Sequence, residues 1–337
     1  MLACVYEDRA SDVVAVKLLV ASLERHCPGL AVEVTVPDAD AATRAWFAGR
    51  PYARLRTARL TPERLGTPGG YDVKPFLLGR ALADGAAEAV WIDSDVIVAG
   101  DIRPLFAGAA PEALGVTEEI FGVSHEGGTV RTAGMGLPVG RRMRRTANTS
   151  VLRVTAAHAA LLTEWGRWLC APAYRAAQAA EWYDRPLWFL TDQEVLTGLL
   201  GSARFAHVPI RWLRRGPDIA HCFHLGGTGY TVFQRLANVT RGRTPPFVHS
   251  VGERPWRPSG GRPTLHLETS PYTLAAAAYR DVVGEPLPWT SATLPAARAC
   301  RALARDGLTA SGLLPALGRE LRDQRALKTL LRSAAAR

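Results

Sequence analysis

The chain has 337 residues, of which 47% are hydrophobic and 21% charged, and its formal net charge is +10. These values are those of an ordinary globular protein, and the length allows one large α/β domain or two smaller ones. Its five cysteines are odd in number, scattered and without Cys-x-x-Cys pairs, which argues against a disulfide framework or a zinc site.

No segment has eighteen consecutive apolar residues, and Met1 to Tyr6 lacks the basic start and apolar stretch of a signal peptide, so we expect a cytoplasmic protein. Almost all of the positive charge comes from arginine. This bias fits genome composition as well as it fits an anionic partner such as a nucleotide, a membrane surface or an acidic acceptor. No basic stripe is interleaved with aromatic residues, so we do not expect nucleic acid as a partner.

The first third of the chain alternates between strand and helix patterns. The expected elements are two strands, Leu2 to Tyr6 and Leu30 to Val36, and three helices, Ser11 to His26, Asp40 to Gly49 and Lys74 to Ala83. Pro28 and Gly29 are a plausible stop for the first helix, and the stretch before Gly70 looks irregular. Alternating strands and helices predict a parallel sheet with right-handed crossovers, and ligands bind such sheets beyond the carboxyl ends of the strands.

The segment from Val90 to Val98 is an apolar run interrupted by two carboxylates, Asp93 and Asp95. The run predicts one buried strand, with Asp93 and Asp95 on the same side and Ser94 pointing away. Two buried carboxylates this close favour protonation unless a cation lies between them, so the pair predicts a divalent metal site. The alternative is an Asp-rich turn after a strand, which explains most Asp-x-Asp triplets.

Three later segments carry polar residues beside apolar runs. Asn148 lies in a predicted polar turn that leads into a strand ending at Val154, and it could simply be a turn residue. Thr191-Asp192-Gln193-Glu194 begins an apolar helix within Leu187 to Leu200, and taken alone this segment is better explained as a helix capping box than as a functional site. His249 ends a short apolar strand, followed by a Gly-containing turn, Arg254 and Pro255-Trp256. A single histidine in such a place is usually structural.

Taken in order, five segments resemble the signature segments of GT-A-fold glycosyltransferases, most closely the family that contains glycogenin and bacterial galactosyltransferases, called family 8. The segments are Lys74-Pro75-Phe76, Val90 to Asp95, Asn148 to Val151, Asp192-Gln193 and His249 to Trp256. The similarity spans about residues 1 to 285 and implies the α/β GT-A (Rossmann-like) fold, with a mostly parallel central sheet, as one catalytic domain.

The resemblance implies a role for each matching residue. The implied metal ligands are Asp93, Asp95 and His249; the implied donor-binding residues are Tyr6, Lys74, Asp93, Ser94, Asn148, Gly252 and Arg254; the implied catalytic residues are Asp192 and Gln193. A nitrogen ligand beside two carboxylates suits Mn²⁺ somewhat better than Mg²⁺.

The implied activity is that of a metal-dependent, hexosyltransferase-type enzyme that moves a sugar, with retention of configuration, from a nucleotide sugar such as a UDP sugar to a saccharide, lipid-linked or small-molecule acceptor. Retention proceeds either by attack on the same face within an ion pair or through a covalent intermediate, and in the second case Asp192 has the chemistry of the nucleophile. Two alternatives remain at this level, a nucleotidyltransferase of related α/β fold and a non-catalytic glycan- or nucleotide-binding module.

Two further segments have possible functions. Residues 121 to 145 are glycine-rich and contain Arg141, Arg142, Arg144 and Arg145, which we hypothesise contact an anionic donor or acceptor; a solvated charge run is the alternative. Residues 286 to 337 are rich in Ala, Leu and Arg, which predicts a basic helical extension. That extension would either pack on its own domain or lie at the inner face of an anionic membrane.

Overall fold

The computed structural model describes residues 1–58, 72–119, 127–222, 245–251, 254–257, 265–268, 270–295 and 297–298. The chain divides into two compact units. The first comprises Met1–Val13, Gly29–Ser94 and Arg103–Leu213; the second comprises Val14–Pro28, Asp95–Ile102 and the described residues from Arg214 onward. Within the described ranges, no helix combines the length and the apolar character needed to cross a membrane.

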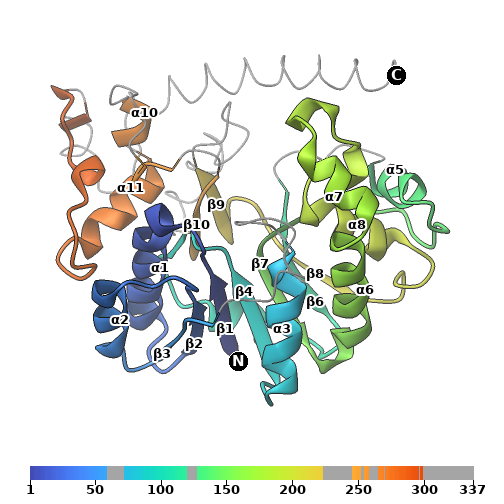
Figure 1. Ribbon diagram of the computed structural model, residues 1–337, viewed down its shortest axis with the longest axis horizontal. Coiled ribbons are helices and arrows are strands. Elements are labelled where there is room, and N and C mark those ends of the chain that lie inside the picture. The colour runs from blue at the N-terminus through green and yellow to red at the C-terminus, as the bar shows by residue number, and fades with distance from the viewer. Residues whose placement is uncertain are drawn as a thin grey trace. The chain divides into compact units, whose positions relative to one another are not determined.

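The first unit is built on a seven-stranded sheet with the strand order β3-β2-β1-β4-β7-β6-β8 (Figure 1). Its strands are β1 (Leu2–Tyr6), β2 (Ala31–Thr35), β3 (Ala53–Arg56), β4 (Glu88–Ile92), β6 (Leu114–Glu118), β7 (Ala147–Thr155) and β8 (Ile210–Leu213). Strand β7 runs antiparallel to its neighbours β4 and β6, and the other pairings are parallel. The predicted mostly parallel sheet is therefore confirmed.

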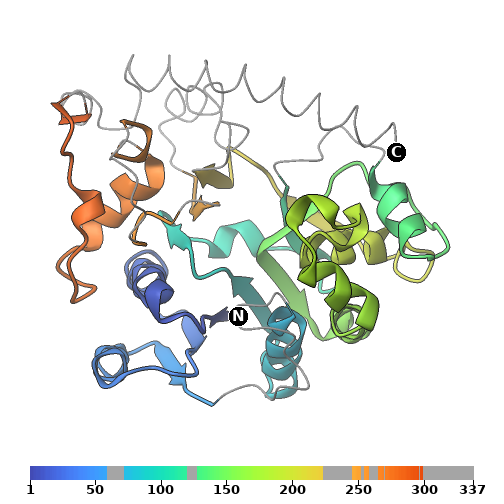
Figure 2. The ribbon, with the colours of Figure 1, turned by 45° about the horizontal axis from the view of Figure 1, so that its top comes forward.

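The helices of the first unit are α2 (Ala41–Ala48), α3 (Val73–Ala83), α4 (Arg103–Phe106), α5 (Gly127–Gly134), α6 (Ala159–Leu169), α7 (Pro172–Ala179) and α8 (Asp192–Gly201). Helices α3, α6 and α8 pack on one face of the seven-stranded sheet around a continuous apolar core, and α4 contacts the opposite face at Gly115. Trp91 of β4 and its register partner Leu152 of β7 point into this core. There they join Leu78 of α3, Trp165 of α6 and Leu199 of α8. Figures 1 and 2 both show α3 and α6 side by side.

The second unit contains helix α1 (Val13–His26) and a three-stranded sheet with the order β5-β10-β9. The strands are β5 (Val96–Val98), β9 (Ile219–Cys222) and β10 (Phe247–Ser250), and two short helices follow, α10 (Leu265–Glu268) and α11 (Pro271–Ala276). Strand β10 is parallel to β9 and antiparallel to β5. The hydroxyl of Ser22 accepts a hydrogen bond from the Val98 N–H at 2.9 Å and so joins α1 to β5.

Most of the elements expected in the first third of the chain are present. Helix α1 begins two residues later than expected, after the 3₁₀ turn η1 (Ala10–Asp12), and it ends before Gly29, whose φ of 81° suits glycine. Asp40 caps α2 by accepting a hydrogen bond from the Thr43 N–H. Strand β3 was not predicted, because its alternating Ala53-Arg54-Leu55-Arg56 forms a half-exposed edge of the sheet rather than an apolar run.

The prediction of one continuous strand over Val90 to Val98 is wrong. Strand β4 ends at Ile92, Ser94 and Asp95 form a turn, and β5 then begins in the other sheet. The Asp93 N–H donates to Ser150 O at 2.8 Å, whereas Asp95 O accepts from the Ser250 N–H at 2.9 Å. Two carboxylates are poorly suited to the middle of a buried strand, and here they lie in the turn that connects β4 to β5.

Asn148 and the 121 to 145 segment also differ from expectation. Asn148 lies within β7, in which every residue is buried, rather than in a turn. Residues 127–134 form helix α5, and Arg141 donates to the carbonyl oxygens of Leu200 and Val208 at 2.9 and 2.8 Å. Arg145 lies 3.5 Å from a Glu118 oxygen. Arg141 and Arg145 therefore have structural partners, and residues 120–126 lie outside the described ranges.

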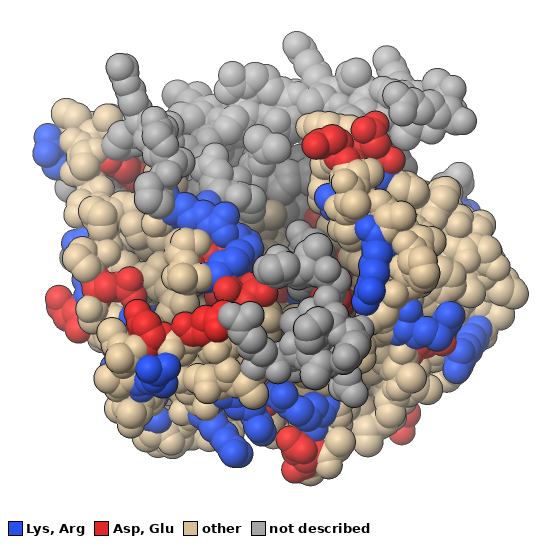
Figure 3. All heavy atoms as spheres, in the orientation of Figure 1, with Lys and Arg blue, Asp and Glu red and all other residues tan. Residues whose placement is uncertain are grey.

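The excess of arginine does not form one uninterrupted basic surface on the face drawn in Figure 3. Blue basic and red acidic side chains alternate over the described part of that face. The predicted C-terminal helix cannot be compared, because residues 299–337 lie outside the described ranges.

Candidate functional site

Asp93 stands at the carboxyl end of β4, where two side chains contact its carboxylate. Its Oδ1 accepts a hydrogen bond from the Trp91 indole Nε1 at 2.6 Å and lies 3.0 Å from Lys74 Nζ. The side chain of Asp93 is 26% exposed and that of Lys74 only 6%. The buried ammonium of Lys74 therefore contacts the partly exposed carboxylate of Asp93, at the sheet edge where α/β folds bind ligands.

Lys74 also contacts a second carboxylate, that of Asp192. Its Nζ lies 3.3 Å from Asp192 Oδ2 and donates to Thr149 Oγ1 at 2.9 Å. The Thr149 hydroxyl in turn donates to Asp192 Oδ2 at 2.6 Å. The chain from Lys74 through Thr149 to Asp192 joins α3, β7 and α8, and the sequence alone assigned no role to Thr149.

Asp192 is the first residue of α8 and is fully buried. Burial raises the pKa of this carboxyl group, and the neighbouring Lys74 ammonium and Thr149 hydroxyl oppose that rise. The capping box of α8 uses other residues, because Glu194 Oε2 accepts hydrogen bonds from the N–H and the hydroxyl of Thr191. The capping prediction is thus confirmed for Thr191 and Glu194, and it leaves the Asp192 carboxylate for contacts with Lys74 and Thr149.

The amides of Asn148 and Gln193 lie beside a buried acid that the sequence did not single out. The Asn148 Nδ2 donates to Glu119 Oε2 at 2.6 Å and to Gln193 Oε1 at 3.3 Å. The Asn148 Oδ1 accepts from the Ser150 N–H at 3.0 Å. These bonds hold the two amides that the sequence placed near a donor sugar in fixed orientations. Glu119 follows β6 with no motif of its own, so no sequence signal marked it.

Glu194 and Arg131 form a buried pair behind these amides. Their closest side-chain atoms are 3.8 Å apart, and both side chains are about as buried as those of the core. Burial raises the pKa of Glu194 to about 7, against the lowering effect of Arg131. Burial also lowers the pKa of Arg131. The network below the first turn of α8 therefore contains an acid that titrates near neutrality.

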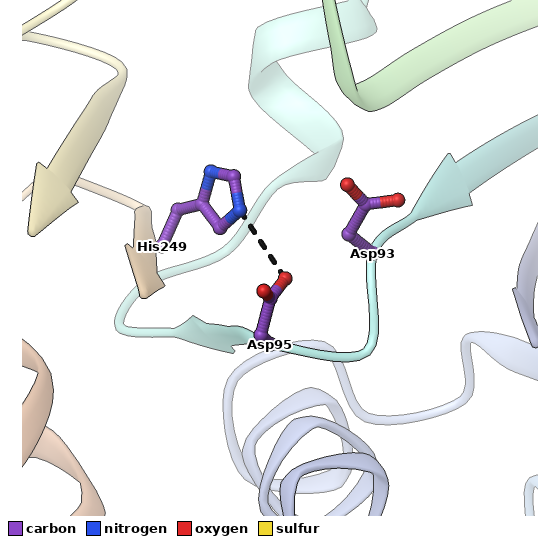
Figure 4. Close-up of side chains that lie close together, drawn as sticks. All are labelled: Asp93, Asp95 and His249. Carbon is purple, nitrogen blue, oxygen red and sulfur yellow. Dashed lines mark ion pairs between the residues drawn. The ribbon is translucent and has the colours of Figure 1, made fainter. Parts of the chain in front are cut away.

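In the second unit, Asp95 and His249 point toward each other (Figure 4). The His249 Nε2 lies 3.2 Å from Asp95 Oδ1, and Arg254 Nη2 lies 3.9 Å from Asp95 Oδ2. The pairing of β5 with β10 produces this arrangement, because Asp95 directly precedes β5 and His249 is opposite Val96. His249 is thus not an isolated core histidine.

Asp93 is one residue removed from Asp95, so the backbone itself keeps the two carboxylates adjacent. Asp93, Asp95 and His249 each offer one ligand atom, and these atoms lie within 4.8 Å of one another. Two atoms that each lie about 2.2 Å from a shared ion are at most about 4.4 Å apart, so small side-chain movements suffice. Two carboxylates and an imidazole therefore fit a divalent cation in number, chemistry and spacing.

Both carboxylates of the proposed metal site already have a cationic neighbour. Lys74 partly balances the charge of Asp93, and Arg254 partly balances that of Asp95. Cationic side chains thus already reduce the repulsion between the two carboxylates. The spacing of the ligand atoms, and not an unmet need for positive charge, is what favours a metal site.

The remaining predicted donor-binding residues have different surroundings. Ser94 Oγ donates to the buried Glu7 Oε2 at 2.7 Å, and Glu7 also accepts two hydrogen bonds from the Arg9 guanidinium. Tyr6 belongs to the apolar core, and its hydroxyl donates to Asp8 Oδ2 at 3.3 Å. Gly252 lies outside the described residues.

Several solved glycosyltransferases share this fold. A crystal structure of the galactosyltransferase LgtC in complex with donor and acceptor sugar analogues matches with a TM-score of 0.54 at 15% identity, over 86% of this chain and 98% of LgtC. An active-site mutant of LgtC matches with a TM-score of 0.52 at 16% identity, over the same shares of the two chains. The apo structure of the bifunctional glycosyltransferase WbbM matches with a TM-score of 0.50 at 13% identity, over 86% of this chain and 50% of WbbM.

At these identities the likeness concerns the fold. The chain has the GT-A fold, and the resemblance to GT-A glycosyltransferases that its motifs predict is confirmed at that level. No protein-family model matches the chain, and no curated protein matches it in sequence.

Proposed function

We propose that this chain is a metal-dependent glycosyltransferase that moves a sugar from a nucleotide sugar, a UDP sugar in the first instance, to an acceptor with retention of configuration. Residues 1–285 would form its catalytic domain. The observation that carries the proposal is that Asp93, Asp95 and His249 offer ligand atoms within 4.8 Å of one another, in a chain with the GT-A fold.

Asp93, Asp95 and His249 would hold Mn²⁺ or Mg²⁺. When bound, such a cation neutralises negative charge on the nucleoside diphosphate that leaves the sugar. Arg254, whose guanidinium lies 3.9 Å from Asp95, would contact the same phosphates. Ser94, Gly252 and Tyr6 remain predicted donor-binding residues.

Asp192 would act on the donor sugar. A carboxylate stabilises the positive charge that develops at the anomeric carbon, or attacks that carbon if the reaction has a covalent intermediate. Both roles require the ionised form, which burial disfavours and which Lys74 and Thr149 favour. The amides of Gln193 and Asn148, fixed by their bond to each other and to Glu119, would bind sugar hydroxyls.

Melting temperatures of the purified chain test the proposal. UDP, UDP-glucose, UDP-galactose and GDP-mannose would each be added with Mn²⁺ and with EDTA, since a ligand that binds only the native state raises the melting temperature. We expect a metal-dependent rise with a UDP compound, and its loss in Asp95→Asn. Asp184→Asn, at an exposed position of a 3₁₀ turn, is the matched control and should respond like the wild type.

Product analysis separates the proposed activity from its alternatives. A glycosyltransferase releases a nucleoside diphosphate when it transfers the sugar, and also when it slowly hydrolyses the donor in the absence of an acceptor. A nucleotidyltransferase instead releases or consumes pyrophosphate. A binding module yields a thermal shift without either product. The proposal is wrong if no UDP or GDP compound stabilises the wild type in a metal-dependent way, or if Asp95→Asn is stabilised equally.

A further inference from the structure

His221 lies beside the proposed metal ligand His249, and no motif in the sequence marked it. Strands β9 and β10 are parallel, and His221 of β9 is the direct register partner of His249 of β10. Register partners on adjacent strands project from the same face of a sheet. The two rings are therefore neighbours because of the strand pairing, and both are buried.

The two rings approach each other through the same type of atom. The Nδ1 of His221 lies 3.0 Å from the Nδ1 of His249, and the ring planes are inclined at 61°. A hydrogen bond across this distance requires a proton on one Nδ1 and a lone pair on the other. The tautomers of the two histidines are consequently linked.

The opposite edge of the His249 ring faces the proposed ligands. Its Nε2 lies 3.2 Å from Asp95 Oδ1. An imidazole that binds a cation through Nε2 must present a lone pair there, so the neutral ring carries its proton on Nδ1. Metal-bound histidines regularly donate that second N–H to an acceptor, which fixes the tautomer and the orientation of the ring.

We propose that His221 is the positioning residue for His249: its Nδ1 accepts the Nδ1–H of His249 and so holds the Nε2 lone pair toward the cation. This inference rests on the cation site of the proposed function. His221 is not itself a proposed ligand, because its Nδ1 faces the His249 ring, and among the described residues the possible ligand group consists of Asp93, Asp95 and His249.

Two substitutions separate the positioning role from simple packing. His221→Phe keeps an aromatic ring but removes the acceptor. His221→Asn keeps an acceptor oxygen near the position of Nδ1 while removing the ring. If His221 acts through its lone pair, the smaller Asn should preserve metal binding better than the bulkier Phe, whereas a packing role predicts the reverse order.

The experiment measures Mn²⁺ binding to the metal-free full chain by electron paramagnetic resonance titration, with melting temperatures of the metal-free variants as a check on folding. We expect His221→Phe to weaken Mn²⁺ binding about 10- to 100-fold, and His221→Asn to stay within about threefold of the wild type. Spin-echo modulation from the directly bound His249 nitrogen should persist in His221→Asn and weaken in His221→Phe.

The outcomes distinguish this inference from the proposed function. If the wild type binds Mn²⁺, Asp95→Asn does not, and His221→Phe binds like the wild type, the positioning role is wrong and the cation site stands. Equal losses in the Phe and Asn variants also overturn the role of the lone pair. Should His221→Phe not fold, His221→Asn decides the matter: binding weakened tenfold or more contradicts the inference. Failure of the wild type to bind Mn²⁺ overturns both proposals.

Discussion

The Nζ of Lys74 lies 3.3 Å from Oδ2 of Asp192, and both side chains are almost completely buried. Lys74 also lies 3.0 Å from Asp93, so one ammonium serves two carboxylates. Paired charges in a protein interior are tolerated because each partner offsets the lost hydration of the other, and removal of one partner leaves an uncompensated charge. Lys74 thus connects the edge of the proposed metal site to the carboxylate that we place beside the donor sugar.

We expect the energetic effects of Lys74 and Asp192 to be strongly non-additive. Lys74→Met should lower the free energy of unfolding by about 3–5 kcal/mol, because Asp192 loses its counter-charge. Adding Asp192→Asn should recover roughly 1–3 kcal/mol of that loss, since the second substitution removes the stranded carboxylate. Urea unfolding of the wild type, both single variants and the double variant at pH 7 gives the coupling; effects that simply add would show that the two groups do not depend on each other.

We expect the loss of the Thr149 hydroxyl to lower donor turnover. Thr149→Val removes the hydroxyl that accepts from Lys74 and donates to Asp192, while keeping the shape of the side chain. A hydrogen bond to a charged group contributes about 1.5–3 kcal/mol, so donor turnover should fall about tenfold to hundredfold.

Thr155→Val is the matched control for that measurement. Thr155 lies on the same strand and is also buried, but its hydroxyl donates to Pro111 O instead. It should lose stability without a comparable loss of turnover per folded molecule. Equal effects of the two substitutions on turnover would argue against a specific role of Thr149.

The stability of the wild type relative to Glu194→Gln should fall as pH rises. Burial raises the pKa of Glu194 from 4.5 to about 7, so between these values the folded state binds more protons than the unfolded state. The penalty for ionising the buried carboxyl is absent below pH 4.5 and complete above pH 7, where it should reach on the order of 3 kcal/mol. Urea unfolding of both proteins from pH 4 to pH 8 measures it.

Glu164→Gln should show the opposite trend. Hydrogen bonding to Arg167 lowers the pKa of Glu164, so the contribution of the Glu164 carboxylate to stability is present above its unfolded pKa and is lost as pH falls below that value.

If the wild type instead becomes more stable than Glu194→Gln with rising pH, the attraction of Arg131 outweighs the burial of Glu194, contrary to our assignment.

Arg141 should be required for stability and not for donor binding. Arg141→Gln removes hydrogen bonds to the carbonyl oxygens of Leu200 and Val208, and the loss of donors to buried acceptors should cost about 1–3 kcal/mol. Arg144→Gln, at an exposed position, should change the free energy of unfolding by less than about 0.5 kcal/mol. Melting temperature and UDP affinity separate the two effects; weaker UDP binding with unchanged stability in Arg141→Gln would restore the anion-contact hypothesis.

Local sequence patterns identified the elements that depend on periodicity. The strand from Leu2 to Tyr6, the helices α2 and α3 and the capping residues of α8 all follow from alternation, helical spacing and side-chain capping, which act over a few residues. The order of five short motifs predicted the fold through its resemblance to GT-A-fold glycosyltransferases. Strand β3 was not predicted, because an edge strand lacks the apolar run that indicates a central strand.

The contacts within the site depended on tertiary structure. The packing of helices on the sheet places Thr149 between Lys74 and Asp192, and strand pairing brings Asn148 to Glu119 and His221 to His249. No local pattern encodes which elements become neighbours. The same is true of the turn from Asp93 to Asp95, which connects the two sheets: the Asp93 N–H donates to Ser150 O, and Asp95 O accepts from the Ser250 N–H. The amino-acid sequence by itself determined the elements and the chemical groups they carry, whereas the register between distant strands decided which of these groups meet.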